Sequence, residues 1–177
     1  AAVHEIRTNG AINLGEGVSE TPGSSDVVGG IFLNAGSGVL WISTSGDDIR
    51  LNGAVELQSD VVITTNSTET DGANDQSLGG DILFTDDATI DSQANGDVSE
   101  DNDLRLLAGT GSISFNADLG ARQSGTAGDY NSQLGALTVA DTTGSVTFGG
   151  ADSESAGSDL AAVHEIRTNG AINLGEG

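Results

Sequence analysis

The sequence predicts an all-β protein: a parallel β-solenoid, in which short strands stack coil upon coil. Short apolar runs alternate with polar residues and are bounded by Gly and Asp, which is typical of strands. A nine-residue spacing between apolar positions recurs from run to run. In addition, the segment AAVHEIRTNGAINLGEG at 1–17 returns unchanged at 161–177. An internal repeat of this kind favours an architecture in which each unit buries its apolar residues against its neighbours.

The repeated segment sets the expected domain organisation. Its two copies begin 160 residues apart, so we interpret residues 1–160 as one complete repeat and residues 161–177 as the start of the next, within a tandem array. We expect the apolar residues of the two copies to form the contact between successive repeats. These residues are Val3, Ile12, Leu14, Val163, Ile172 and Leu174.

Seven apolar runs follow one another along the chain, and the seventh repeats the first. They lie at 3–14, 31–42, 49–64, 82–90, 104–115, 137–148 and 163–174. Most runs predict two strands around a short Gly-containing turn, because apolar residues nine apart, such as Leu104 and Ile113, flank that turn. We expect the core to contain Ile31, Leu33, Leu40, Ile42, Leu104, Leu106, Ile113, Phe115, Leu137, Val139, Val146 and Phe148.

The starts of the runs divide the 160-residue repeat into six coils of unequal length, with variable polar loops leaving at the side. At about 4.8 Å per coil, one repeat would advance roughly 29 Å. The alternative is a series of antiparallel β-sandwich domains, with about seven short strands in each. The shared nine-residue spacing and the absence of cysteine favour the solenoid.

Composition limits the function classes. The chain has 36% hydrophobic but only 3% aromatic residues, together with 27 Gly, which predicts a thin, regular core. A net charge of −22 argues against nucleic acid and anionic membranes as partners, because binding to phosphates depends on cationic contacts. No segment approaches the roughly 20 apolar residues of a membrane span. Without cysteine, neither disulfides nor a thiolate zinc site can form.

Three segments carry a resemblance to a known family. LRLLAGTGSISFNADLG, LGALTVADTTGSVTFGG and LNGAVELQSDVVITTN resemble the degenerate repeats of large bacterial surface proteins of the filamentous haemagglutinin type and their giant tandem-repeat relatives. The resemblance covers most of residues 29–177. It implies a right-handed parallel β-helix, secreted and displayed as a fibre at the bacterial cell surface, with an adhesive or scaffolding role.

Candidate chemistry is sparse. His4 stands beside Glu5, but adjacent strand residues point to opposite faces, so the two side chains cannot converge on one substrate atom. The acidic segment GDVSEDND offers the oxygen ligands that Ca²⁺ takes, although it lacks a complete calcium-loop motif. If a metal binds, we expect its ligands at Asp97, Glu100, Asp101 and Asp103. The alternative is that the acidic loops are simply solvated.

We therefore expect a non-catalytic structural protein of an extracellular fibre, whose partners are copies of itself along and between fibres, with Ca²⁺ as the one candidate cofactor. The alternative is an adhesin module whose side loops, at 66–78 and 117–133, bind glycans or neighbouring cells. An enzyme would need carboxylates that converge on one sheet face.

Overall fold

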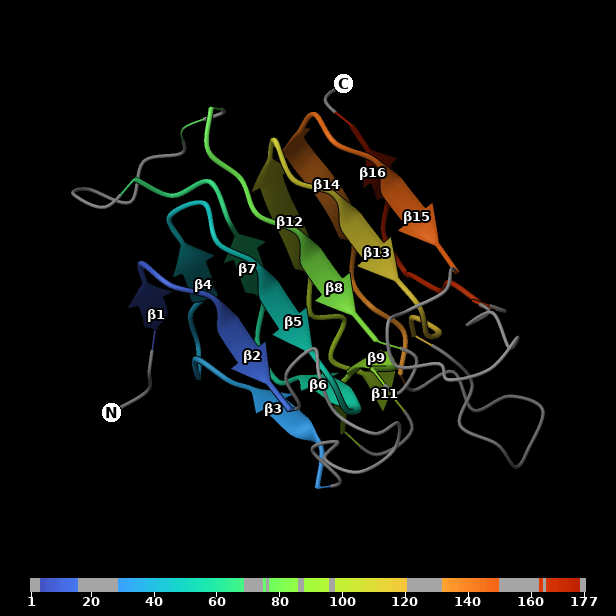
Figure 1. The fold of residues 1–177 in the computed structure, drawn as a ribbon. Coiled ribbons are helices and arrows are strands. Elements are labelled where there is room, and N and C mark those ends of the chain that lie inside the picture. Colours follow the sequence, from blue (N-terminus) through green and yellow to red (C-terminus); the bar gives the residue numbers. More distant parts are fainter. Residues whose placement is uncertain are drawn as a thin grey trace.

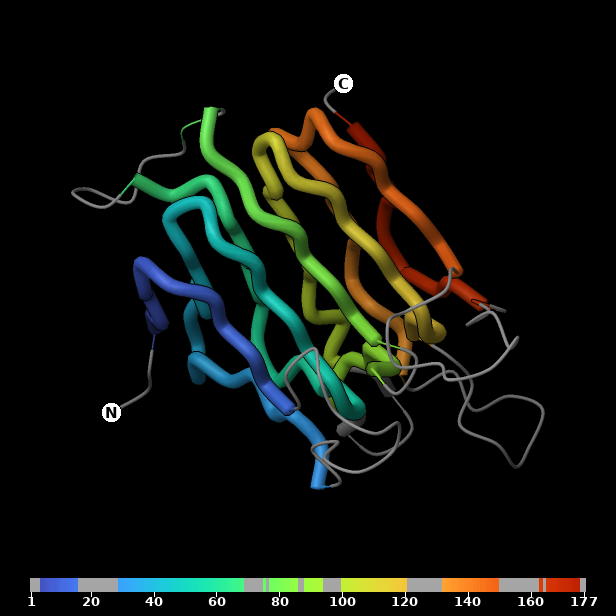
Figure 2. The backbone as a smooth tube through the Cα atoms, in the orientation of Figure 1, coloured from blue at the N-terminus to red at the C-terminus, as the bar shows by residue number. Residues whose placement is uncertain are grey.

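The computed structural model describes residues 4–15, 29–68, 75, 77–85, 88–95, 98–120, 132–149, 163 and 165–175. These residues form a β-solenoid of about four turns, built from parallel sheets and without helix (Figures 1 and 2). The predicted solenoid is confirmed, and the antiparallel sandwich is wrong. The described part of the chain therefore also holds no helix that could cross a membrane.

The largest sheet, sheet A, holds one strand from each successive turn. Leu104 illustrates the parallel register, because it pairs with Val61 on one side and with Leu137 on the other. In Figure 1, β1 lies at one end of this stack and β16 at the other. The strands are, in spatial order, β1 (Glu5–Thr8), β4 (Leu40–Thr44), β7 (Val61–Thr64), β12 (Leu104–Gly109), β14 (Leu137–Thr142) and β16 (Ile172–Leu174).

Two further sheets complete each turn. Sheet B contains β2 (Ile12–Leu14), β5 (Ile49–Leu51), β8 (Ile82–Phe84), β13 (Ile113–Phe115) and β15 (Val146–Phe148). Sheet C contains β3 (Ile31–Leu33), β6 (Val55–Leu57) and β9 (Ile90–Ser92). Parallel bridges from Ile90 to Leu119, and from Leu119 to Ile166, extend sheet C by two turns. The chain thus visits the sheets in the order A, B, C. An antiparallel pair, β10 (Ala94–Asn95) with β11 (Val98–Ser99), lies outside this pattern.

The core is a thin column of aliphatic residues with one aromatic ladder. Alternate residues of each strand point inward, so the pattern apolar–polar–apolar in three residues is enough to cover one side of a turn. The rings of Phe84, Phe115 and Phe148 stack on one another along sheet B. Ten of the twelve expected core residues are buried, and Val146 and Phe148 are partly buried against the same core.

Glycines permit the close stacking of the corners between sheets A and B. A Cβ added to Gly111 would lie 2.0 Å from the carbonyl oxygen of Gly80, and a Cβ added to Gly144 would lie 2.2 Å from the carbonyl oxygen of Gly111. Such distances are far inside van der Waals contact. The corner therefore requires glycine in each of these successive turns, which explains the Gly-containing turns seen in the sequence.

The division into coils differs from the one expected. The run 31–42 contains β3 of sheet C and β4 of sheet A, whereas the run 104–115 contains β12 of sheet A and β13 of sheet B. The nine-residue spacing therefore fits more than one kind of corner, and a run does not mark the start of a turn. For this reason the six-coil count is not reproduced by the described strands. The right hand of the solenoid stays a prediction.

Candidate functional site

Side chains immediately before the strands of sheet B connect each turn to the next. The Asp81 N–H donates to Asp48 Oδ1 at 2.8 Å, and the Ser112 N–H donates to Asp81 Oδ1 at 2.8 Å. The row continues to the next turn, where the Ser145 N–H donates to Ser112 Oγ at 3.2 Å. The side chains thus supply hydrogen bonds along the axis where the corner interrupts the strand ladder.

The same arrangement precedes the strands of sheets A and C. The Asp103 N–H donates to Asp60 Oδ1 at 2.9 Å, and the Ala136 N–H donates to Asp103 Oδ1 at 2.7 Å. Before the third sheet, the Glu165 N–H donates to Asp118 Oδ1 at 3.0 Å. An acidic residue at a corner is therefore a structural link between turns.

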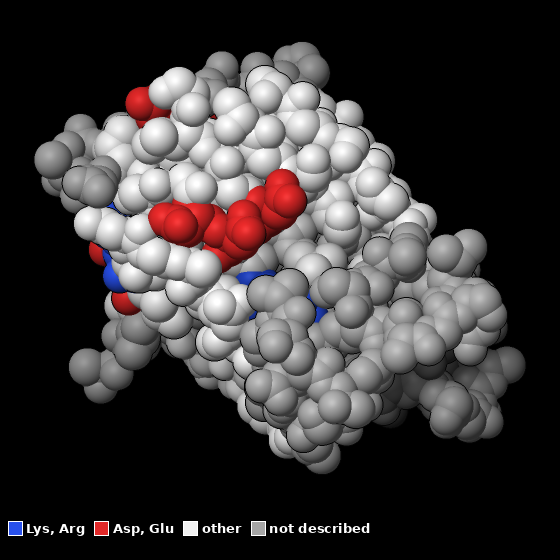
Figure 3. Space-filling model, viewed as in Figure 1, with Lys and Arg blue, Asp and Glu red and all other residues white. Residues whose placement is uncertain are grey.

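This arrangement also places like charges one above another. Asp48 and Asp81 hold equivalent positions in successive turns, as do Asp60 and Asp103. Neighbouring turns are about 4.8 Å apart, so the carboxylates of each pair repel one another across a short distance. Figure 3 shows acidic side chains gathered in a band on the face of the molecule seen in Figure 1.

The expected calcium ligands are placed as follows. Asp97 lies outside the described residues, and Glu100 is exposed. The carboxylate of Asp101 accepts a hydrogen bond from Asn169 Nδ2 at 2.6 Å, while that of Asp103 accepts the Ala136 N–H. In the described ranges, no group of three or more His, Asp and Glu side chains is arranged to hold a metal ion. Calcium binding by the whole segment stays a prediction.

The first residues of the repeat form an ion pair within strand β1. Glu5 Oε1 lies 2.6 Å from the guanidinium of Arg7, two residues along the strand and on the same face. The second copy repeats this contact, because Arg167 Nε donates to the Glu165 carboxylate. His4 is exposed, and its copy His164 lies outside the described residues. Among the described residues, the two copies thus share an ion pair between the glutamate and the arginine of this segment.

Core-facing residues are exposed at both ends of the solenoid. Ile6 pairs with the buried Ile42 and yet is 41% exposed, because it belongs to the first turn. At the other end, Ile172 is 46% and Leu174 is 52% exposed. These positions face the same column as the core, so a further turn stacked on either end would bury them.

The second copy of the repeated segment lies on one of these ends. Ile172 pairs with Leu137 and Leu174 with Val139, and Ile166 bridges to Leu119. Val163 packs against the core, as do Ile12 and Leu14 of the first copy at the opposite end, whereas Val3 lies outside the described residues. The second copy of the segment therefore stacks on the turns that contain Leu119 and β14.

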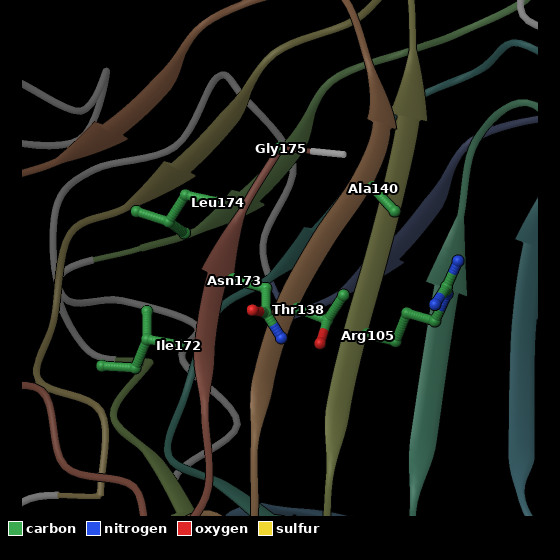
Figure 4. Close-up of a pocket in the computed structure, with 7 residues that line it drawn as sticks. All are labelled: Arg105, Thr138, Ala140, Ile172, Asn173, Leu174 and Gly175. Carbon is green, nitrogen blue, oxygen red and sulfur yellow. The ribbon is translucent and has the colours of Figure 1, made fainter. Parts of the chain in front are cut away.

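A shallow groove of about 570 Å³ follows this junction along sheet A (Figure 4). Arg105, Thr138 and Asn173 occupy paired positions on β12, β14 and β16, so their side chains lie in one row across the three strands. The groove is lined by Arg105, Thr138, Ala140 and residues 172–175. Arg105 is the charged residue of this lining, and the other lining residues are small, polar or aliphatic.

The structure describes only parts of the two side loops that the adhesin alternative requires. Of the loop 66–78, residues 69–74 and 76 lie outside the described part, and of the loop 117–133, residues 121–131 do. The adhesin alternative therefore stays a prediction.

Comparisons with known protein families, with curated proteins and with solved structures find no match to this chain.

Proposed function

We propose that this chain is a structural segment of an extracellular filament, in which tandem copies of a 160-residue repeat stack into one continuous β-solenoid. The observation that supports this function best is the pairing of β16, part of the second copy, with β14 of the first repeat. Strand edges that lack a partner are templates for further strands. The sequence supplies the matching strand from its own next repeat.

The hydrogen bonds between the turns suit a filament with a structural role. Main-chain hydrogen bonds run along the axis in all three sheets, and the corner carboxylates add side-chain bonds in the same direction. Each turn is stabilised by its two neighbours, so the length of such an array is limited only by the number of copies. The net charge of −22 per 177 residues would keep separate filaments apart, or allow divalent ions to bridge them.

The resemblance to filamentous haemagglutinin-like proteins supplies the location and the hand. On that basis the filament is secreted, lies on a bacterial cell surface and winds to the right. These three features are proposals that follow from the resemblance.

The test compares chains that contain one, two and three copies of the repeat by electron microscopy and small-angle X-ray scattering. A continuous solenoid predicts a smooth rod of constant cross-section, whose length grows by roughly 20–25 Å per copy at about 4.8 Å per turn. A flexible string of beads, with a bead added per copy, would contradict the proposal. The one-copy chain is the control that fixes the cross-section.

A further inference from the structure

The two copies of the repeated segment occupy different sheets. In the first copy, Glu5–Thr8 lies in sheet A and Ile12–Leu14 in sheet B. In the second copy, Ile166 extends sheet C and Ile172–Leu174 joins sheet A. Identical sequences are thus displaced by one sheet, since the chain order is A, B, C.

This displacement fixes the number of turns between equivalent residues. Starting from β1, the chain returns to sheet A at β4, β7, β12 and β14, which makes four turns. It then passes sheet B at β15 and reaches sheet C at Ile166, the equivalent of Ile6. Each step is between directly paired neighbours, so the count does not depend on the loops. One repeat therefore spans four and two-thirds turns, or roughly 22 Å at about 4.8 Å per turn.

We propose, on the basis of the filament function above, that each repeat is rotated by one sheet relative to the previous one. The free edge of β15 then binds the Ile31–Leu33 segment of the following copy. That copy places its β1 on sheet C, its β2 on sheet A and its β3 on sheet B. Its β4 would stack on its β1, and its β5 on its β2, as in the first copy. All contacts within a repeat are preserved while the three sheets exchange roles.

The two strand edges brought together in this way are complementary. Strand β15 ends the order of sheet B and strand β3 ends that of sheet C, so in the described residues each has one edge without a strand. In both strands the first and third residues are apolar, and the middle residue is Thr147 in β15 and Phe32 in β3. Neither strand contains a charged residue, although the chain carries a charge of −22. Pairing would set Val146 beside Ile31, Thr147 beside Phe32, and Phe148 beside Leu33.

Burial supports the same partner. Phe148 stacks on Phe115 at 5.1 Å between ring centroids and is only partly buried, because it stands at the end of the aromatic ladder. Leu33 of the following copy would cover its free side. Phe32 is 57% exposed on the outer face of β3, where it would lie next to Thr147.

The rotation also determines how surface residues recur along the filament. Three copies, or 14 turns, return a given residue to its original sheet after roughly 67 Å. A row such as Asp48 and Asp81 then shifts to another corner in each copy. In a filament without rotation, by contrast, the corresponding rows of all copies would lie at the same corner and be aligned along the axis.

The test on the chain itself uses pairs of cysteines, because the native sequence contains none. Asn173→Cys with Thr138→Cys joins positions that are paired in the rotated arrangement. Asn173→Cys with Thr147→Cys joins positions that would be paired if the second copy kept the sheets of the first. Paired neighbours in a sheet lie within the Cα range of a disulfide. The first pair should oxidise at least about tenfold faster than the second, because only its thiols are held within reach. Faster oxidation of the second pair would overturn the proposal, and so would equal rates.

A chain of two full copies tests the partner of β15. Thr147→Cys in the first copy should form a disulfide with Phe32→Cys of the second copy, and not with Asn13→Cys of the second copy, which is the partner expected without rotation. A disulfide to Asn13→Cys in a smooth rod would refute the rotation and leave the filament function intact. A chain that is beaded in electron micrographs and forms neither disulfide would refute both.

Discussion

The aromatic ladder of sheet B allows a stability prediction with a matched control. Phe115 is fully buried between Phe84 and Phe148, with ring centroids at 5.2 and 5.1 Å and interplanar angles of 5° and 6°. Phe115→Ala should lower the free energy of unfolding by about 3–5 kcal/mol, because it leaves a cavity and removes two ring contacts. Phe148→Ala removes one ring contact at a partly buried position and should cost about 1–2.5 kcal/mol.

Equilibrium unfolding in urea, followed by far-ultraviolet circular dichroism at constant salt, measures both losses. Urea is preferred to guanidinium because an ionic denaturant would also screen the charge of −22. A loss below about 1 kcal/mol for Phe115→Ala, or one no larger than for Phe148→Ala, would refute a closely stacked ladder. In a two-copy chain, Phe148→Ala in the first copy should become more costly if the next repeat covers that ring.

Three further predictions concern the corners and the loops. Gly111→Ala should destabilise the fold by several kcal/mol in urea unfolding, because its Cβ would meet the Gly80 carbonyl, whereas Gly29→Ala, with open space around it, should be nearly neutral. Asp103→Ala should cost about 1 kcal/mol through loss of the bond from the Ala136 N–H, while Asp103→Asn keeps an acceptor, removes repulsion and should match or exceed the native stability at low salt. Equal losses for the two Asp103 variants would contradict this role. The Ser77 hydroxyl lowers the pKa of Asp75 below its usual 3.8, so Ser77→Ala should raise that pKa in a carbon-13 titration. Because the folded pKa is lowered, this contribution to stability is present above pH 4 and is lost as the pH falls through the folded pKa.

The fold class and the core follow from the sequence because the signal is local. In a solenoid, each strand needs only three residues with alternating polarity, and runs such as 104–115 and 137–148 display this pattern directly. A parallel stack adds no requirement for long amphipathic segments. The residues that fill the column could therefore be identified one strand at a time.

The number of turns could not be derived in the same way. Corners between sheets A and B and between sheets C and A both accommodate a nine-residue spacing, as 104–113 and 31–40 show. The sequence of a short strand does not by itself determine which sheet the strand joins, because the inward residues of all three sheets are apolar. The identical Ile12–Leu14 and Ile172–Leu174 lie in different sheets for this reason.

The structural role of the corner aspartates was not predicted. The carboxylate of Asp103, a candidate calcium ligand, accepts the Ala136 N–H of the next turn. A signal for this role was present, because Asp stands immediately before the apolar strand at positions 48, 60, 81 and 103. Reading acidic residues only as solvated or metal-binding groups overlooks their use as hydrogen-bond acceptors for the neighbouring backbone.

Fibre diffraction from oriented filaments of a multi-copy chain tests the continuous solenoid most directly. A strong meridional reflection near 4.8 Å, together with an axial period of roughly 22 Å per repeat, is the result that we predict. A period of about 40 Å or more without the 4.8 Å meridional reflection would show separate domains and would contradict a continuous stack of turns.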